Sequence, residues 1–155
     1  MNRKIKNPYP ADEYKCFACS PSNPIGLKLT FEENDDYVEA YWDGDPNFQG
    51  YNNVIHGGII ATILDEVGAW FIGVKIGTAG VTKSLNINYL KPLYLSRGPH
   101  KARAKLQKQE NNLVNLECEI FDNTETLCAR AESQFFVYPE NIAKKRFQYP
   151  GKDAF

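Results

Sequence analysis

Apolar residues recur along this chain with two different periods, one typical of a helix and one typical of strands. A single segment repeats them at helical spacing over about four turns: Ile60, Ile63, Leu64, Val67, Phe71 and Val74. Gly77 and Gly80 follow this stripe and are predicted to end the helix. Alternation of apolar and polar residues predicts strands at residues 26–31, 37–42, 81–90, 100–107, 113–121 and 126–138.

The order of these elements predicts the fold class. Runs of consecutive strands favour an antiparallel sheet, and the lone helix must cover one face of it. We therefore expect an α+β fold with five to six strands around one long helix. Residues 1–25 contain four prolines and no regular period, so they are expected to form an N-terminal arm. Residues 139–155 are expected to form a C-terminal tail that exposes the basic run Lys144-Lys145-Arg146.

Composition narrows the class of protein further. A chain of 155 residues, 43% of them hydrophobic, is long enough for one core, so residues 1–155 are expected to form a single domain. The formal net charge of −1 argues against a basic nucleic-acid-binding domain. No segment resembles a signal peptide or a membrane span, so no membrane association and a cytoplasmic location are expected.

The four cysteines do not have the spacing of a common zinc site. Cys16 and Cys19 form a CxxC pair, whereas Cys118 and Cys128 lie ten residues apart in predicted strands and on opposite faces. Zinc sites usually combine two pairs at similar spacing. The sequence therefore predicts no metal site and a reduced cysteine pair in an N-terminal loop.

The helix face opposite the apolar stripe carries small residues instead of the charged ones that face solvent: Ala61, Thr62, Asp65, Gly68, Ala69 and Ile72. Small residues allow another backbone to approach closely. We expect this face to pack against the same helix of a second subunit, because two-fold homodimers are the commonest assembly. The alternative is that loops of the same chain cover it.

The start of the helix is the strongest candidate for chemistry. Gly57 and Gly58 follow His56, and unpaired N–H groups at a helix N-terminus can stabilise an oxyanion. Asp65, on the small-residue face, is a candidate base or nucleophile. Each of these residues also has a purely structural explanation. Gly57 and Gly58 could form a tight turn, His56 could cap the helix, and Asp65 could simply face solvent.

Spacing along the helix limits how these groups can act together. Gly57 and Asp65 are eight residues apart, which is about 12 Å along a helix axis at about 1.5 Å per residue. An oxyanion donor and a nucleophile must both reach one carbonyl. Two antiparallel helices from two subunits satisfy this requirement, and a single helix does not.

These motifs resemble the PaaI-like group of hotdog-fold acyl-CoA thioesterases over about residues 16–138. The resemblance rests on the segments Cys16-Phe17-Ala18-Cys19, Asn23-Pro24-Ile25-Gly26-Leu27, Phe48-Gln49-Gly50, His56-Gly57-Gly58, Leu64-Asp65-Glu66 and Gly80-Val81-Thr82 to Pro92. It implies a hotdog fold and homodimers or dimers of dimers with active sites at subunit interfaces. It also implies hydrolysis of acyl-CoA without metal or cofactor, with coenzyme A as part of the substrate.

The resemblance also implies roles for individual residues. Asp65 would be the general base or nucleophile, and the N–H of Gly57 or Gly58 would polarise the thioester carbonyl. His56 would orient the loop or the water, and Thr82 would help to hold water beside the carboxylate. Candidate substrate-binding residues are Gln49, Asn53, Glu66, Lys91 and Arg97, the last two for the phosphates of coenzyme A.

The sequence departs from the family pattern in the loop before the helix. Gly50 stands where some members have Asn, and Asn52-Asn53 stands where Pro-Gly is common. Either Gln49 or Asn53 could supply the missing amide. A non-catalytic thioester-binding module is therefore an alternative function. A third hypothesis is a dehydratase, for which His100, predicted in a turn, is the only other histidine. The acyl or aryl group, coenzyme A versus a carrier protein, and dimer versus tetramer stay open.

Overall fold

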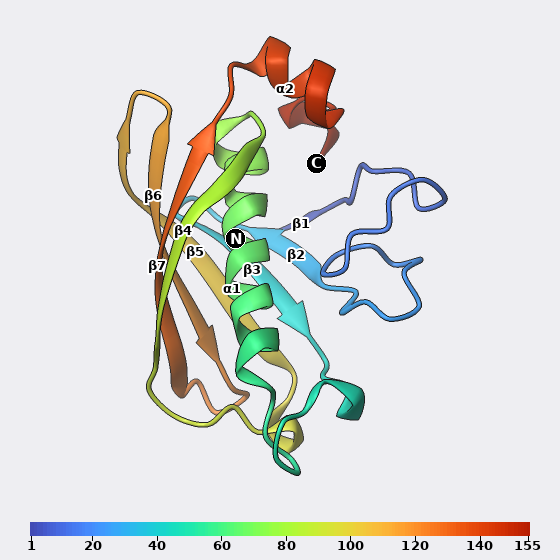
Figure 1. The fold of residues 1–155 in the computed structure, drawn as a ribbon, viewed down its shortest axis with the longest axis vertical. Helices are drawn as coiled ribbons and strands as arrows, with labels where there is room; N and C mark the ends of the chain where they lie inside the picture. The colour runs from blue at the N-terminus through green and yellow to red at the C-terminus, as the bar shows by residue number, and fades with distance from the viewer.

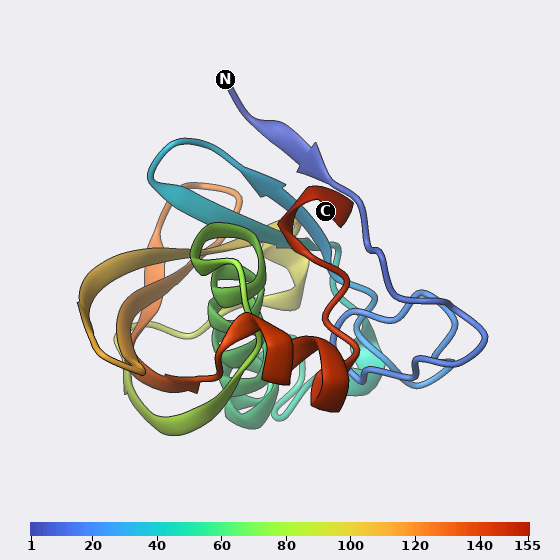
Figure 2. The same ribbon diagram turned by 90° about the horizontal axis from the view of Figure 1, so that it is seen from above.

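The computed structural model describes residues 1–155, in which one long helix lies against a curved sheet (Figures 1 and 2). Helix α1 (Gly57–Phe71) packs on seven antiparallel strands in the order β1-β2-β3-β5-β6-β7-β4. This is the expected hotdog fold, with seven strands instead of five to six. The strands are β1 (Arg3–Ile5), β2 (Thr30–Glu33), β3 (Tyr37–Trp42), β4 (Gly80–Tyr89), β5 (His100–Glu110), β6 (Leu113–Phe121) and β7 (Leu127–Val137).

Helix α1 and the segment that continues it bury the predicted apolar stripe. Each of its six residues is at most 4% exposed. A wider π-helical segment, η2 (Ile72–Ile76), continues the helix until Gly77, whose φ of 83° is left-handed. Gly80 does not end the helix as expected; it begins β4, where a Cβ would lie 2.8 Å from the carbonyl oxygen of Phe136. None of the helices combines the length and apolar character needed to span a bilayer.

Each of the six predicted strands is present at about its predicted position, with one shifted, and β1 is an additional strand. β3 and β6 have the predicted bounds, whereas the strand expected at residues 26–31 begins at Thr30. The N–H groups of Leu27 and Leu29 donate to the carbonyl oxygens of Phe17 and Ala18 at 2.9 Å. Residues before Thr30 therefore pair with the cysteine-containing loop of the arm and not with the sheet.

His100 belongs to the strand predicted at residues 100–107 and not to the turn that was also expected for it. It is the first residue of β5, and its ring is buried beside Trp42, with ring centroids 5.6 Å apart. Its Nε2 atom makes a 2.9 Å hydrogen bond with the carbonyl oxygen of Tyr94. A core position next to a tryptophan explains this histidine without a catalytic role.

The helix face predicted to meet a second subunit is only partly available. Gly68 is buried against the chain's own sheet, where a Cβ would lie 2.9 Å from the ring of Phe135. Ile72 is also buried, at 1% exposure. The remaining four residues of this face are partly exposed: Ala61, Thr62, Asp65 and Ala69.

Both ends of the chain carry regular structure that the alternation pattern did not predict. The arm adds β1 to the edge of the sheet, and the tail forms helix α2 (Glu140–Phe147). The Tyr14 hydroxyl donates to the Phe147 carbonyl oxygen at 3.0 Å, so the arm and the tail hold each other. The Tyr149 hydroxyl donates to the Gly73 carbonyl oxygen at 2.8 Å, which ties the tail to η2. The Lys144-Lys145-Arg146 run is exposed as expected.

Candidate active site

His56 is the N-cap of helix α1. Its Nδ1 atom accepts a 2.9 Å hydrogen bond from the Gly58 N–H, so the proton of the neutral ring lies on Nε2. Its backbone N–H donates to the Phe48 carbonyl oxygen at 3.0 Å, which ties the preceding loop to the helix start. His56 thus orients the loop and the helix end, as one of the predicted roles requires.

The two candidate oxyanion donors differ in this arrangement. The Gly58 N–H is already used by His56, whereas the Gly57 N–H, at the first position of the helix, donates to no protein acceptor. The Tyr89 hydroxyl donates to the Gly57 carbonyl oxygen at 2.7 Å and holds the end of β4 against the helix start. Sequence reasoning missed this contact, because nothing in the alternation of β4 distinguishes Tyr89. Gly57 is therefore the available donor of the pair.

Asp65 lies two turns further along α1 and is paired with Thr82. The Thr82 hydroxyl donates to Asp65 Oδ1 at 2.6 Å, so the two predicted residues come together. Asp65 is partly exposed and forms no ion pair with a basic side chain. The Thr82 bond fixes one carboxylate oxygen and leaves the other available.

An irregularity in β4 aims Thr82 at the helix. Thr82 pairs with Phe135 of β7, but the register shifts before Ser84, which pairs with Gln134. Lys83 is the extra residue of this β-bulge. Strict alternation would put Thr82 on the same side as Ser84, away from the helix. The bulge instead places it on the side of Phe135, whose ring packs against Gly68 of α1.

Gln49 and Asn53, in the loop before the helix, make different hydrogen bonds. Asn53 adopts a left-handed conformation with φ of 64°, and its side chain exchanges two hydrogen bonds with Ser96, at 2.9 and 3.0 Å. Its backbone N–H donates to Gln49 Oε1 at 2.9 Å. Asn53 is thus committed to holding the loop, while the side-chain N–H₂ group of Gln49 has no protein acceptor. Gln49 is the better candidate for the missing amide.

Arg97 and Lys91, the two basic residues proposed to bind the phosphates of coenzyme A, differ in whether they already have an acidic partner. Arg97 lies 3.4 Å from Asp122 Oδ2 and its guanidinium stacks 5.3 Å from the Tyr94 ring centroid. Lys91 is exposed, lies just after β4 and has no acidic partner. Of the two, Lys91 is free to bind an anion.

Asp122 itself should stabilise the turn beside Arg97. Its burial opposes ionisation, but hydrogen bonds from Thr124, Thr126 and Arg97 outweigh that effect and hold the pKa of Asp122 at about 2, below the ordinary 3.8. Because its pKa is lowered on folding, the stabilisation is present above pH 3.8 and is lost as pH falls through about 2. Asp122→Asn should therefore lower the free energy of unfolding at pH 7 by about 1–3 kcal/mol.

Urea unfolding at a series of pH values measures this effect. The wild type should lose stability to the variant's level at strongly acidic pH, and the difference between them should be largest near neutrality. Glu125→Gln, at an exposed position in the same turn, is the control and should change little. Equal stability of Asp122→Asn and the wild type at pH 7 would contradict the assignment.

Glu66 does not join Asp65 but faces the N-terminal arm. Its Oε1 atom accepts hydrogen bonds from the Trp70 indole N–H at 3.0 Å and from the Cys16 thiol at 3.4 Å. Burial, followed by the nearby charge of Cys16, raises the pKa of Glu66 above its ordinary value. The structure therefore separates Glu66 from the other predicted substrate-binding residues and groups it with Cys16 and Cys19.

A cavity of about 370 Å³ lies between α1, the arm and the tail. Its lining includes Cys16, Cys19, Glu66, Ala69, Trp70 and Phe147. Ala69 is one turn beyond Asp65 on the same helix, so the cavity begins close to the Asp65–Thr82 pair.

Comparison with known proteins identifies the family of this chain. Residues 52–129, which include α1 and most of the candidate site, match the Thioesterase superfamily. A protein of Saccharolobus solfataricus that is named an esterase is 30% identical over 120 residues, covering 76% of this chain and 77% of that protein.

Solved structures share the fold. The PaaI protein of E. coli is 16% identical, with a TM-score of 0.65 over 74% of this chain and 82% of that chain. A Bacillus halodurans protein solved with CoA is 26% identical, with a TM-score of 0.64 over 73% of this chain and 76% of that chain. The match to the superfamily and the 30% identical relative show that this chain belongs to the thioesterase superfamily, and the solved structures show that it shares the hotdog fold of PaaI.

Proposed function

We propose that this protein hydrolyses an acyl-CoA thioester, without a metal ion, at sites shared between two subunits. The observation that carries the proposal is the placement of the two reactive groups on α1. The free N–H of Gly57 and the carboxylate of Asp65 lie eight residues apart on one continuous helix, about 12 Å at about 1.5 Å per residue. Both groups reach one carbonyl only if a second α1 runs antiparallel to the first.

The chemistry follows from these two groups. The thioester carbonyl oxygen accepts a hydrogen bond from the Gly57 N–H, which stabilises negative charge as it develops there. Asp65 of the second subunit takes a proton from a water molecule while the water oxygen attacks the carbonyl carbon, or attacks that carbon itself to form an anhydride that water then hydrolyses. The carbon–sulfur bond breaks, and coenzyme A leaves as a thiolate that takes up a proton.

Exposed apolar residues support a subunit interface beside the site. β4 is an edge strand that pairs only with β7. Val81 is 41% exposed, and Tyr89 and Leu90 are each 53% exposed, at the two ends of this strand. An open strand edge with large apolar side chains is a surface that proteins usually cover. Since Thr82 and Tyr89 contact Asp65 and Gly57, a subunit seated on β4 would lie next to both reactive groups.

An acyl-CoA panel tests the activity. Hydrolysis is followed by the release of free thiol across short, long and aromatic acyl groups. Turnover of at least one class supports the proposal, and the free Lys91 next to β4 supports coenzyme A over an uncharged leaving group. Tight binding by calorimetry without any turnover would instead show a thioester-binding module.

Gly57→Pro should remove the oxyanion donor while leaving the helix intact. Proline lacks an N–H and suits the first position of a helix, and the φ of −59° and ψ of 134° at His56 suit a residue before proline. We expect kcat to fall by about 10²–10³. Gly57→Ala is the matched control: it keeps the N–H, and its Cβ would lie 3.5 Å from Tyr89, an ordinary contact. Equal activity of the two variants would rule out this donor.

Mixed dimers test whether the site is shared. Co-expression of Gly57→Pro and Asp65→Asn chains with different affinity tags allows the heterodimer to be isolated. If each site takes one group from each subunit, the heterodimer has one doubly altered site and one intact site. It should then regain about half of the wild-type activity per dimer. A heterodimer as inactive as the two parents would show that each site lies within one chain.

The substitution Gln49→Glu tests whether the side-chain amide of Gln49 donates a hydrogen bond to the substrate. The substituted side chain still accepts the hydrogen bond from the Asn53 N–H, but it loses the free N–H₂ donor and adds a negative charge. We expect kcat/KM to fall at least about tenfold, the equivalent of one lost hydrogen bond to a substrate. Asn53→Asp, which removes the donor to Ser96, should mainly lower the thermal stability of the loop. The reverse pattern would reassign the two residues.

A further inference from the structure

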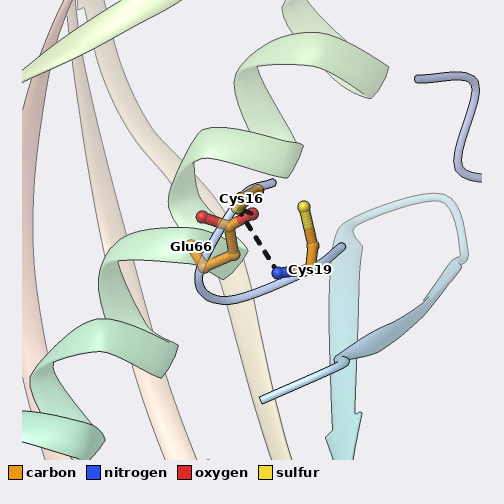
Figure 3. A group of neighbouring side chains, drawn as sticks. All are labelled: Cys16, Cys19 and Glu66. Carbon is orange, nitrogen blue, oxygen red and sulfur yellow. Dashed lines mark hydrogen bonds between the residues drawn. The ribbon is translucent and has the colours of Figure 1, made fainter. Parts of the chain in front are cut away.

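The CxxC turn of the arm holds its sulfur atoms in a ligand-like arrangement. The backbone N–H of Cys19 points at the Cys16 sulfur at 3.4 Å, so the turn folds around this sulfur and donates to it. Cys16 and Cys19 are both free thiols. Figure 3 shows them gathered with Glu66 between the arm and α1. The two sulfurs and a carboxylate oxygen of Glu66 all lie within 4.8 Å of one another.

The rest of the arm motif serves to hold this turn. The Asn23 side chain donates to the Lys15 carbonyl oxygen at 3.0 Å and accepts from the Ile25 N–H at 3.1 Å. At Gly26 a Cβ would lie 2.6 Å from the Phe17 carbonyl oxygen, so only glycine allows the two segments to approach. These contacts account for the Asn-Pro-Ile-Gly segment that the catalytic proposal leaves unused.

Glu66 lacks the partner that a carboxylate in such a place usually has. No lysine, arginine or histidine lies within ion-pair distance of it. Its only hydrogen bonds from nitrogen or sulfur groups come from Trp70 and Cys16. The Trp70 indole N–H fixes the direction of the carboxylate, as hydrogen-bond donors beside a metal-binding side chain commonly do.

We propose that Cys16, Cys19 and Glu66 bind a divalent zinc ion that ties the arm to α1. Two thiolates with a carboxylate suit zinc better than magnesium or calcium, which prefer oxygen ligands. Tetrahedral bonds of about 2.3 Å to sulfur and about 2.1 Å to oxygen separate the two ligand atoms by about 3.6 Å. The Cys16 sulfur and Glu66 Oε1 are 3.4 Å apart, so this pair needs almost no movement.

The fourth position of the ion faces the cavity that these three residues help to line. Three protein ligands and a water molecule are the usual set of a zinc site that stays open to exchange. The expectation of no metal, drawn from the spacing of four cysteines, did not include this site because its third ligand comes from the helix. None of the three ligands is Gly57, Asp65 or Thr82, so metal binding and the proposed hydrolysis use different residues and can be tested separately.

Metal binding by the untagged protein of residues 1–155 tests the proposal. Reduced protein is stripped with a chelator, dialysed and titrated with Zn²⁺ or Co²⁺. We expect one ion per chain, a thiolate-to-cobalt charge-transfer band with Co²⁺, and a higher melting temperature with Zn²⁺. Cys16→Ser and Cys19→Ser should abolish the charge-transfer band, and Glu66→Gln should weaken binding at least about tenfold. Cys128→Ser, a buried cysteine in β7, is the matched control and should bind as the wild type does.

Alkylation of the wild-type protein gives a measurement that needs no variant. Zn²⁺ should protect Cys16 and Cys19 from iodoacetamide, and a chelator should remove the protection. Absence of a stoichiometric ion, or unchanged binding in the Cys16→Ser/Cys19→Ser double variant, would overturn the proposal. Protection that a reductant but not a chelator removes would show a disulfide and would overturn it as well.

Discussion

Asp65→Asn is expected to lower kcat for thioester hydrolysis by about 10²–10⁴, the usual contribution of an essential acid–base group. The asparagine side chain has the same shape and still accepts the 2.6 Å hydrogen bond from Thr82, so only the charge and the basicity are lost. Because Asp65 is partly exposed and forms no ion pair, the free energy of unfolding should change by no more than about 0.5 kcal/mol. Steady-state kinetics on the best acyl-CoA substrate, with urea unfolding, measures both.

Two further variants sharpen the result for Asp65. Thr82→Val removes the hydroxyl donor and should reduce kcat less than Asp65→Asn does, because it alters the position of the carboxylate but not its chemistry. Asp36→Asn, in the exposed turn between β2 and β3, is the control and should keep full activity. Full activity of Asp65→Asn would remove this residue from the catalytic assignment.

Phe135→Ala is expected to produce the largest loss of stability in the chain. Phe135 is 1% exposed, and its ring fills the space left by Gly68 in the middle of α1. Removing a buried phenylalanine side chain lowers the free energy of unfolding by about 3–5 kcal/mol, because burial is lost and a cavity remains. Since Gly68 lies one turn from Asp65, the helix segment that carries the carboxylate should also become more mobile.

The neighbouring residue provides the matched control. Phe136 lies on the opposite face of β7, where it is only partly buried and packs edge to face with Tyr138. Phe136→Ala should cost clearly less than Phe135→Ala in denaturant unfolding followed by fluorescence or circular dichroism. A similar cost for both variants would mean that the contact between Gly68 and Phe135 does not hold α1 to the sheet.

Local periodicity was sufficient for the long elements and insufficient for the short ones. The stripe from Ile60 to Val74 and the strands at 37–42 and 113–121 are long and strongly patterned, and the structure confirms them. β1 has three residues and α2 has eight mostly polar ones, so neither carries a readable period. Both depend on distant contacts, such as the Tyr14 bond to Phe147, that no local pattern encodes.

The amino-acid sequence by itself determined the hotdog architecture, the placement of His56, Gly57 and Gly58 at a helix start, and the eight-residue separation of Gly57 from Asp65. The hotdog architecture follows from the resemblance of the sequence motifs to a known family, and the other two features follow from helix geometry and residue spacing. They also carry the argument for a shared site, since no folding of one chain shortens the distance between two points on a straight helix.

Only the tertiary structure decided how the remaining side chains are used. The bulge at Lys83 turns Thr82 toward Asp65, Ser96 occupies the Asn53 amide and leaves Gln49 free, and His56 takes the Gly58 N–H and leaves that of Gly57. Glu66 points at the cysteines of the arm and not at the Asp65 site. Apart from the local bond between His56 and Gly58, each outcome depends on a register shift or on a partner far away in sequence, and packing rather than local spacing selects such partners.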